Sequence, residues 1–266
     1  MYNGGGRPRY EYRYRFSRND DRIISDDMIF SNWTTLSQGL NVFLFETRTN
    51  FILKRIIVHD DHDDDETIIM GFESYDIKFY EREEELCLEF MMGYRLDEYW
   101  MPDDEIQNLV HGALDFAKQQ LICGVDDKSS IGRVIPLVVG VDVCTVQQEG
   151  EELDAAMDRA IRPEKLIPLS VWYHINYVEK HNHIDLVELV EFMLTLLRIR
   201  VEDVDKGLSL METCPICLHN PTIGTQITFL PLCGHAFHNH CIIRWLQKNN
   251  SCPFCRVRAY DHFLHP

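Results

Sequence analysis

The sequence contains no run of about 18 apolar residues without a charge, which is what a membrane-spanning helix requires. The most apolar stretch, Leu186 to Ile199, is interrupted by Glu188 and Glu191. The first six residues contain three glycines and no apolar core, so we expect no secretory signal. A phosphate-binding glycine loop, a G-x-S-x-G nucleophile elbow and a pair of catalytic carboxylates are also missing. These absences argue against a membrane protein and against the common hydrolase and nucleotide-binding classes.

Positive charge is also scarce. The 266 residues include 26 Lys and Arg against 43 Asp and Glu, which gives a net charge of −17. Segments 1–22 and 212–258 each carry +3 and segment 259–266 carries −1, so segment 23–211 carries −22. An acidic body of this kind argues against nonspecific binding of nucleic acid over most of the surface. The composition, 45% apolar and 26% charged, is globular and leaves room for one large domain or two smaller ones.

Cysteine is nearly absent outside one short segment. Cys87, Cys123 and Cys144 are isolated in apolar surroundings, so we expect them to pack in the core. The other six cysteines fall between positions 214 and 255 and are interleaved with histidines. This placement indicates metal binding in a reducing compartment rather than a disulfide framework. We therefore expect a soluble protein in the cytoplasm, the nucleus or both.

The first hundred residues are expected to be mostly antiparallel sheet. Aromatic and charged residues alternate strictly from Tyr10 to Phe16, which predicts a half-buried strand, although an Arg-rich aromatic arm could instead contact RNA. Two further strands are predicted at 42–45 and 51–58. Segments 75–80 and 86–92 flank the charged run 81–85, a pattern that resembles a hairpin with a solvated tip.

Helices become prominent after residue 100. Apolar residues recur at helical spacing over 103–121, and they predict a helix that packs on the core. A strand is predicted at 131–146, a short acidic helix at 151–161 and an extended segment at 170–178. A capping signal starts a further apolar helix at 186–197, which is either buried or covered by a partner.

These elements predict an α+β region over residues 1–200, a polar linker at 201–212, a small C-terminal module at 213–257 and a short tail at 258–266. The acidic run 59–66 has no glycine at the turn position of a calcium loop, so we interpret it as a solvated loop. We expect residues 1–200 to bind a substrate or a partner, on the logic of domain organisation alone.

The C-terminal module carries the chemistry. Its spacing is C-x2-C, 15 residues, C-x-H-x2-H-x2-C, 10 residues, C-x2-C. Tetrahedral zinc takes four thiolate or imidazole ligands, so eight such residues predict two zinc ions. In a module of about 45 residues, the metal replaces a missing hydrophobic core. Redox-active C-x-x-C pairs would leave the histidines without a role. The eight candidate ligands are Cys214, Cys217, Cys233, His235, His238, Cys241, Cys252 and Cys255.

This pattern resembles the RING finger of the two-histidine subtype, the zinc module of ubiquitin ligases, and it looks like that of many soluble plant members. The family's cross-brace implies that Cys214, Cys217, His238 and Cys241 bind one zinc ion and that Cys233, His235, Cys252 and Cys255 bind the other. The PHD finger, a reader of histone tails, fits less well. It has one histidine after four cysteines and a tryptophan two residues before the seventh ligand, where this chain has Asn250.

The resemblance implies a ubiquitin-protein transferase that binds a ubiquitin-charged conjugating enzyme and promotes transfer to a lysine of a protein substrate. No covalent intermediate forms on the ligase. The family's docking positions correspond to Ile216, Trp245 and Pro253, and Arg256 corresponds to a cation that bridges the conjugating enzyme and ubiquitin. Ile216 and Trp245 could instead only fill the core of the module, and Arg256 could be a solvated charge. Leu232 and Phe237 are expected to be core residues.

One departure from the family concerns the choice of conjugating enzyme. Many members carry acidic residues after the second cysteine, where this chain has Leu218, His219 and Asn220. Two other classes of function remain open at this stage. The chain could be a non-catalytic adaptor that binds partners through its zinc module, or a chromatin reader of the PHD kind.

Overall fold

The computed structural model describes residues 9–56, 65–122, 131–177, 192, 193 and 195–260. The chain divides into two compact units. Unit 1 runs to Val146, apart from residues 60–63, and unit 2 begins at Gln147. Among the helices of the described residues, none is long and apolar enough to span a membrane.

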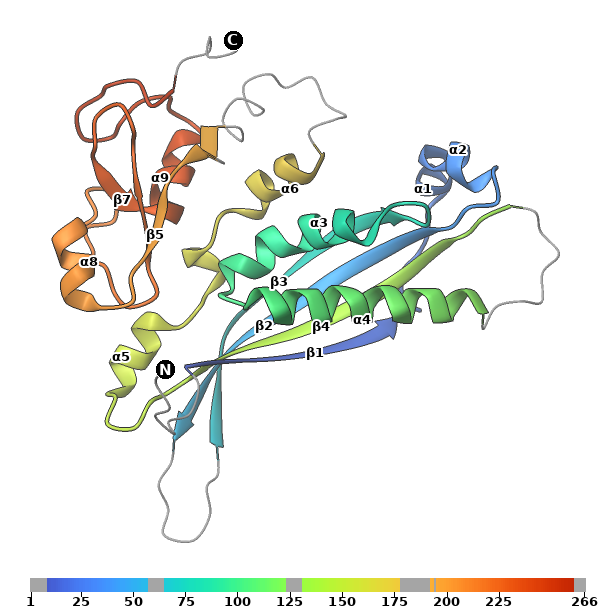
Figure 1. The fold of residues 1–266 in the computed structure, drawn as a ribbon, viewed down its shortest axis with the longest axis horizontal. Coiled ribbons are helices and arrows are strands. Elements are labelled where there is room, and N and C mark those ends of the chain that lie inside the picture. Colours follow the sequence, from blue (N-terminus) through green and yellow to red (C-terminus); the bar gives the residue numbers. More distant parts are fainter. Residues whose placement is uncertain (1–8, 57–64, 123–130, 178–191, 194, 261–266) are drawn as a thin grey trace, which may run out of the picture. The chain divides into compact units, whose positions relative to one another are not determined.

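Unit 1 is a four-stranded sheet with helices on one face (Figure 1). Its strand order is β1-β4-β2-β3, in which β1 and β3 run antiparallel to their neighbours and β2 runs parallel to β4. The region is therefore α+β with antiparallel pairing, as expected, although its central pair is parallel. The strands are β1 (Tyr10–Arg18), β2 (Val42–Ile56), β3 (Asp65–Tyr80) and β4 (Val134–Val146).

Burial explains this arrangement. The central strand β4 is an almost continuous apolar run whose residues are buried on both faces, which is typical of an interior strand. Helices α3 (Glu85–Glu98) and α4 (Asp103–Ile122) contact each other and cover one face of the sheet. Phe51 of β2 meets Tyr99 edge-on, and Phe16 of β1 stacks on Phe116 of α4. The opposite face is polar, with ion pairs such as Arg15–Asp142 and Arg48–Glu46.

The predicted strand at 10–16, helix at 103–121 and strand at 131–146 are confirmed. The predicted strands at 42–45 and 51–58 are parts of the single strand β2. The predicted hairpin around 81–85 is wrong, because residues 86–92 belong to α3. Leu88, Met92 and Leu96 are buried at helical spacing, whereas a strand would turn alternate residues inward. Two short helices, α1 (Asp26–Ser31) and α2 (Trp33–Leu36), precede β2.

Unit 2 begins with α5 (Leu153–Arg159), the 3-10 turn η1 (Pro163–Lys165) and α6 (Leu169–Tyr177). The predicted helix at 151–161 is confirmed, and the predicted extended segment at 170–178 is wrong. Its branched and aromatic residues favour a strand in isolation, but Val171 and Trp172 are buried on one side of α6. Of the predicted helix at 186–197, residues 186–191 and 194 lie outside the described residues, and Phe192, Met193 and Thr195 are helical. Most of the acidic run at 59–66 also lies outside the described residues.

A three-stranded sheet of order β5-β6-β7 forms the centre of the C-terminal part. Its strands are β5 (Arg198–Arg200), β6 (Gln226–Phe229) and β7 (Ala236–His238), and helices α8 (Val204–Leu210) and α9 (Asn239–Leu246) complete it. The predicted linker at 201–212 differs from this structure. Val201 is buried and exchanges backbone hydrogen bonds with Gly224 and Thr225, and α8 follows it. The unit boundary lies instead at 146/147.

The three isolated cysteines have different environments. Cys144 is buried in β4, as expected of a core residue. Cys87 is exposed on α3, so its predicted core position is wrong. Cys123 lies outside the described residues.

Candidate metal centres and the surface around them

The eight candidate ligands gather into two clusters of four. One contains Cys214, Cys217, His238 and Cys241, and the other contains Cys233, His235, Cys252 and Cys255. Within each cluster, the potential ligand atoms lie within 4.8 Å of one another. The chain visits the two clusters alternately, so each cluster joins two segments that are distant in sequence. This is the interleaved grouping that the sequence resemblance implies.

Two similar tight turns bring the cysteine pairs together. In each C-P-x-C segment, the amide of the residue after the second cysteine donates to the carbonyl of the first. Leu218 donates to Cys214 at 2.9 Å, and Arg256 donates to Cys252 at 2.9 Å. The same two residues have positive φ angles, 61° for Leu218 and 63° for Arg256. A non-glycine residue rarely adopts this conformation, so the metal-ligand turn itself dictates the backbone here.

The histidines present the same ring atom to both clusters. Nδ1 of His238 lies 3.2 Å from Sγ of Cys217, and Nδ1 of His235 lies 3.7 Å from Sγ of Cys252. His238 ends β7 and is buried, and Cys241 follows in the first turn of α9. The pairing of β6 with β7, in which His238 lies opposite Ile227, thus fixes the position of this ligand.

The donor set fits zinc. Each cluster offers three sulfurs and one imidazole nitrogen, which are the ligands that tetrahedral zinc prefers. None of these six cysteines forms a disulfide. Burial is the main cause that raises the pKa of the Cys233 thiol to about 11, with the neighbouring Cys252 and Cys255 adding to it. A bound divalent cation would stabilise the thiolate form of Cys233 against both effects. The two clusters can therefore bind two zinc ions.

The apolar core around these clusters is small. It consists chiefly of Ile227, Phe237, Ile242, Ile243 and Leu246, all of them fully or almost fully buried. The prediction that Phe237 is a core residue is confirmed. The same prediction for Leu232 is wrong, because its side chain is 59% exposed in the turn before Cys233.

The three predicted partner-binding residues and the predicted bridging cation all reach the surface. Ile216, Trp245 and Pro253 are half-buried, and Arg256 is exposed. Trp245 donates its indole N–H to the carbonyl of Ser251 at 2.7 Å, which ties α9 to the segment that leads into the last cysteine pair. These side chains therefore retain apolar surface that a partner can cover, although their role in docking stays a prediction.

The sequence did not predict that a further segment packs against the helix beside the first metal centre. The guanidinium of Arg244 on α9 donates to the carbonyls of Glu164 at 2.7 Å and Leu166 at 3.3 Å. One turn later, Gln247 donates to the hydroxyl of Ser170 at 3.2 Å. The segment from η1 to α6 therefore lies against the helix that carries Trp245. No local pattern signals this contact, because Arg244 looks like a solvated charge in the sequence.

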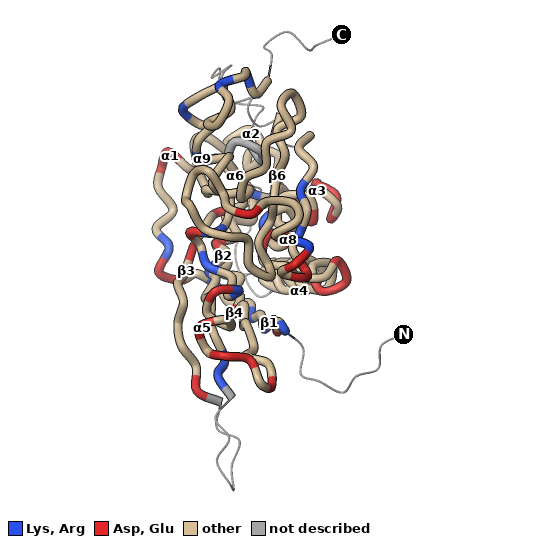
Figure 2. Tube along the Cα trace, turned by 90° about the vertical axis from the view of Figure 1, so that its left-hand side faces the viewer, with Lys and Arg blue, Asp and Glu red and all other residues tan. Residues whose placement is uncertain are grey.

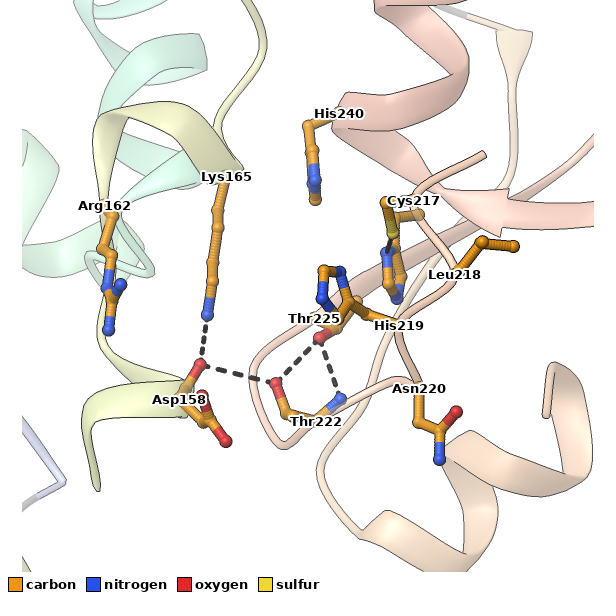
Figure 3. A pocket seen from close by; sticks show the side chains of 11 residues that line it. Asp158, Arg162, Lys165, Cys217, Leu218, His219, Asn220, Thr222, Thr225 and His240 are labelled. Atoms are coloured by element: carbon orange, nitrogen blue, oxygen red, sulfur yellow. Dashed lines mark hydrogen bonds between the residues drawn. The ribbon is translucent and has the colours of Figure 1, made fainter. Parts of the chain in front are cut away.

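A pocket of about 560 Å³ lies between this segment and the first metal-ligand turn (Figure 3). Arg162 and Lys165 line one side, and His219 and His240 line the other. Lys165 donates to the carbonyl of Asp158, which also accepts from Thr222 at 3.5 Å. The pocket and the contacts of Arg244 together form a polar seam, by which we mean the boundary between residues 158–170 on one side and α9 with the first metal-ligand turn on the other.

We expect Arg244→Ala to loosen this seam without disturbing the metal centres. Loss of the two hydrogen bonds from the guanidinium should cost about 1–3 kcal/mol of local stability. Hydrogen exchange of the amides in α6 should become faster, while the amides of β6 and the zinc content stay unchanged. Lys248→Ala, which removes an exposed cation just beyond α9, is the matched control. Unchanged exchange in α6 would show that the seam does not depend on Arg244.

Comparison with known proteins identifies the C-terminal module. Residues 212–256 match the family described as Ring finger domain. The chain is 43% identical over 63 residues to E3 ubiquitin-protein ligase RNF126 of Xenopus tropicalis, a match that covers 24% of this chain and 19% of that protein. It is 54% identical over 43 residues to Probable E3 ubiquitin-protein ligase ATL44 of Arabidopsis thaliana, covering 16% of this chain and 23% of that protein.

Among solved structures, the RING-H2 domain of Arabidopsis RMR1 is 36% identical and matches 26% of this chain and 89% of that chain, with a TM-score of 0.23. The matched segments span about a fifth of the length of these two curated relatives.

Proposed function

Residues 212–256 are a RING finger domain of the two-histidine subtype with two clusters that can bind zinc, and we propose that the whole chain is a RING-type ubiquitin ligase. The interleaved grouping of eight ligands carries this proposal. This grouping brings together the two C-P-x-C turns, which are distant in sequence, and holds their apolar residues Ile216 and Pro253 at the surface. The curated relatives that match this segment are named as E3 ubiquitin-protein ligases, which supports the same activity.

The proposed partner is a conjugating enzyme charged with ubiquitin, and the proposed docking residues are Ile216, Trp245 and Pro253. Half-buried apolar side chains on rigid turns and a short helix are suited to be binding hot spots, because little conformational entropy is lost on association. Zinc, when bound, holds the two turns in place and takes no part in the transfer. The docking surface is thus built from small turns that could not keep their shape alone.

The proposed mechanism is positioning rather than proton transfer. The thioester of the charged enzyme already contains the leaving group, and the substrate lysine is the nucleophile. A ligase that restrains the ubiquitin moiety next to the thioester converts a loosely tethered reactant into an oriented one. Arg256 is exposed directly after the last cysteine, and its guanidinium can donate to two partners at once. We propose that it bridges the conjugating enzyme and ubiquitin.

Residues before the RING finger are proposed to recruit the protein substrate. Unit 1 forms its own sheet and helical layer, and it lies outside residues 212–256, which match the Ring finger domain family. We also propose that the protein works in the cytoplasm, the nucleus or both, because zinc-binding thiols must stay reduced.

We expect Ile216→Ala and Arg256→Ala each to slow ubiquitin discharge from a charged conjugating enzyme to free lysine by at least about tenfold. Ile216→Ala removes apolar docking surface, so it should also weaken binding of the conjugating enzyme. Arg256→Ala should act mainly on the rate of discharge. The measurement is single-turnover discharge across a panel of conjugating enzymes, after confirming two zinc ions per chain. Leu232→Ala and Arg258→Ala are the matched controls.

The same assay separates the ligase from a non-catalytic adaptor. An adaptor would hold two zinc ions and leave discharge at the background rate with every conjugating enzyme. Equal discharge by wild type and both variants would contradict the proposed docking residues but not the ligase activity.

A further inference from the structure

A groove runs between the outer surfaces of α3 and α4 in unit 1. It encloses about 600 Å³ and is lined by residues of both helices. Gly93 lies on the α3 side, and a Cβ atom at this position would meet only Ile106, at 3.7 Å from its Cγ2 atom. The missing side chain of Gly93 therefore leaves open the space that forms the middle of the groove.

Helix α3 is apolar on two sides, and within the described part of unit 1 only one of these sides is buried. Leu88 and Met92 face the core and are completely buried. Leu86 and Phe90, which are also one helical turn apart, line the groove with 66% and 61% of their surfaces exposed. Two large apolar side chains held side by side in solvent at the mouth of a groove are typical of a binding surface rather than of scattered surface residues.

The polar rim of the groove is acidic. Glu89, Asp97 and Asp103 line it, and among its described lining residues there is no Lys or Arg. The one basic residue in α3, Arg95, does not offset this charge, because it is buried on the inner side against Glu73. Figure 2 shows acidic segments on both α3 and α4. A positive partner is therefore favoured at this site.

We propose that this groove is the docking site for a short segment of the protein substrate that presents two apolar side chains flanked by Lys or Arg. The inference rests on the proposed ligase function and gives unit 1 the role of substrate recruitment. Leu86 and Phe90 would receive the apolar side chains, while the carboxylates of Glu89, Asp97 and Asp103 would pair with the cations.

Charge argues against the other occupants. A nucleic acid or an anionic membrane would bring more negative charge to an acidic rim. A second copy of the chain packed symmetrically through the same face would oppose carboxylates with carboxylates. A peptide with both apolar and basic side chains would gain binding free energy from the exposed apolar side chains of the groove and from its acidic rim.

The test starts from short random peptides displayed on phage and selected on the full-length chain. The selected peptides should be enriched in Lys or Arg beside apolar residues. Their affinity, measured by fluorescence anisotropy, should fall at least about tenfold in Phe90→Ala and in Glu89→Lys. Gly93→Leu should block binding similarly by filling the groove, and replacement of a helix-destabilising glycine favours the helical state of α3. Controls with the same chemical change elsewhere are Phe72→Ala, at a residue 79% exposed on β3, and Asp27→Lys on α1.

Each outcome decides the proposal. Selected peptides that are not basic, or whose affinity is unchanged in all three groove variants, would overturn it. A dimer in analytical ultracentrifugation that Phe90→Ala converts to monomer would assign the groove to a second copy and would also overturn it.

Discharge of ubiquitin to free lysine is measured in parallel and should be unchanged in the groove variants. Intact discharge with no groove-dependent binding rejects the docking site alone, and binding without discharge in the wild type rejects the ligase function alone.

Discussion

We expect Cys252→Ser to release zinc from the second cluster and to unfold the C-terminal part of unit 2, with complete loss of ubiquitin discharge. The RING finger has a core of only a few apolar side chains, so metal binding supplies most of its folding free energy. Structural zinc contributes on the order of 10 kcal/mol in comparable small modules, and a hydroxyl is a poor substitute for a thiolate ligand. The interleaved chain path links the two clusters, so the first cluster should lose its ion as well.

Native mass spectrometry and hydrogen exchange together measure this result. Zinc content should fall from two ions, and the amides of β6 and α9 should lose protection. The amides of β2 and β4 should stay protected, because unit 1 has its own core. Cys87→Ser changes an exposed cysteine and should leave both zinc content and exchange unaltered. Simultaneous loss of protection in β4 would contradict the division at 146/147.

Helix α6 reports on the boundary between the units. Contacts of Arg244 and Gln247 join the η1–α6 segment to the RING finger, so its amides should lose protection together with those of α9. A boundary at 200–212, which the polar composition of that segment suggests, predicts instead that α6 stays protected with the sheet of unit 1.

The second large effect is expected in unit 1, where Arg95→Leu should lower the free energy of unfolding by about 3–5 kcal/mol. Side chains of Arg95 and Glu73 are only 1% and 5% exposed. They form a bidentate pair, with Nε to Oε1 at 2.7 Å and Nη2 to Oε2 at 2.5 Å, and the hydroxyl of Tyr99 donates to the same carboxylate. Removal of the guanidinium leaves a buried carboxylate without its cation. The free-energy cost of that unpaired charge is far larger than the net stabilisation that the intact pair contributes.

Urea denaturation of the full-length chain, followed by exchange protection of β2 and β4, measures this loss. The double variant Arg95→Leu with Glu73→Leu should recover part of it, because no buried charge is then left unpaired. Arg48→Leu removes the exposed member of the Arg48–Glu46 pair, which lies at the surface of the sheet, and should cost about 1 kcal/mol. If Arg95→Leu and Arg48→Leu lowered the free energy of unfolding equally, burial would not control the contribution of the Arg95–Glu73 pair.

Local patterns predicted the elements whose signal is contained in their own residues. The strict alternation of β1 and the apolar stripe of α4 each arise from one face that packs on a core, and both elements form where expected. Residues 86–92 misled the prediction because α3 has apolar residues on two sides. Leu86 and Phe90 face outward while Leu88 and Met92 face inward, so the combined pattern alternates as a strand would. Only the packing of α3 on the sheet distinguishes the two.

The RING finger is the part that the sequence by itself determined, because metal ligation is a local chemical requirement. Paired cysteines within one tight turn need a C-x2-C spacing, and eight such ligands are recognisable without any knowledge of the rest of the chain. The tertiary structure alone decided three other features. These are the seam between Arg244 and the η1–α6 segment, the buried Arg95–Glu73 pair, and the acidic groove beside Gly93. Each depends on side chains that are brought together from different elements, and the free energy of such contacts is set by burial and geometry that no single segment encodes.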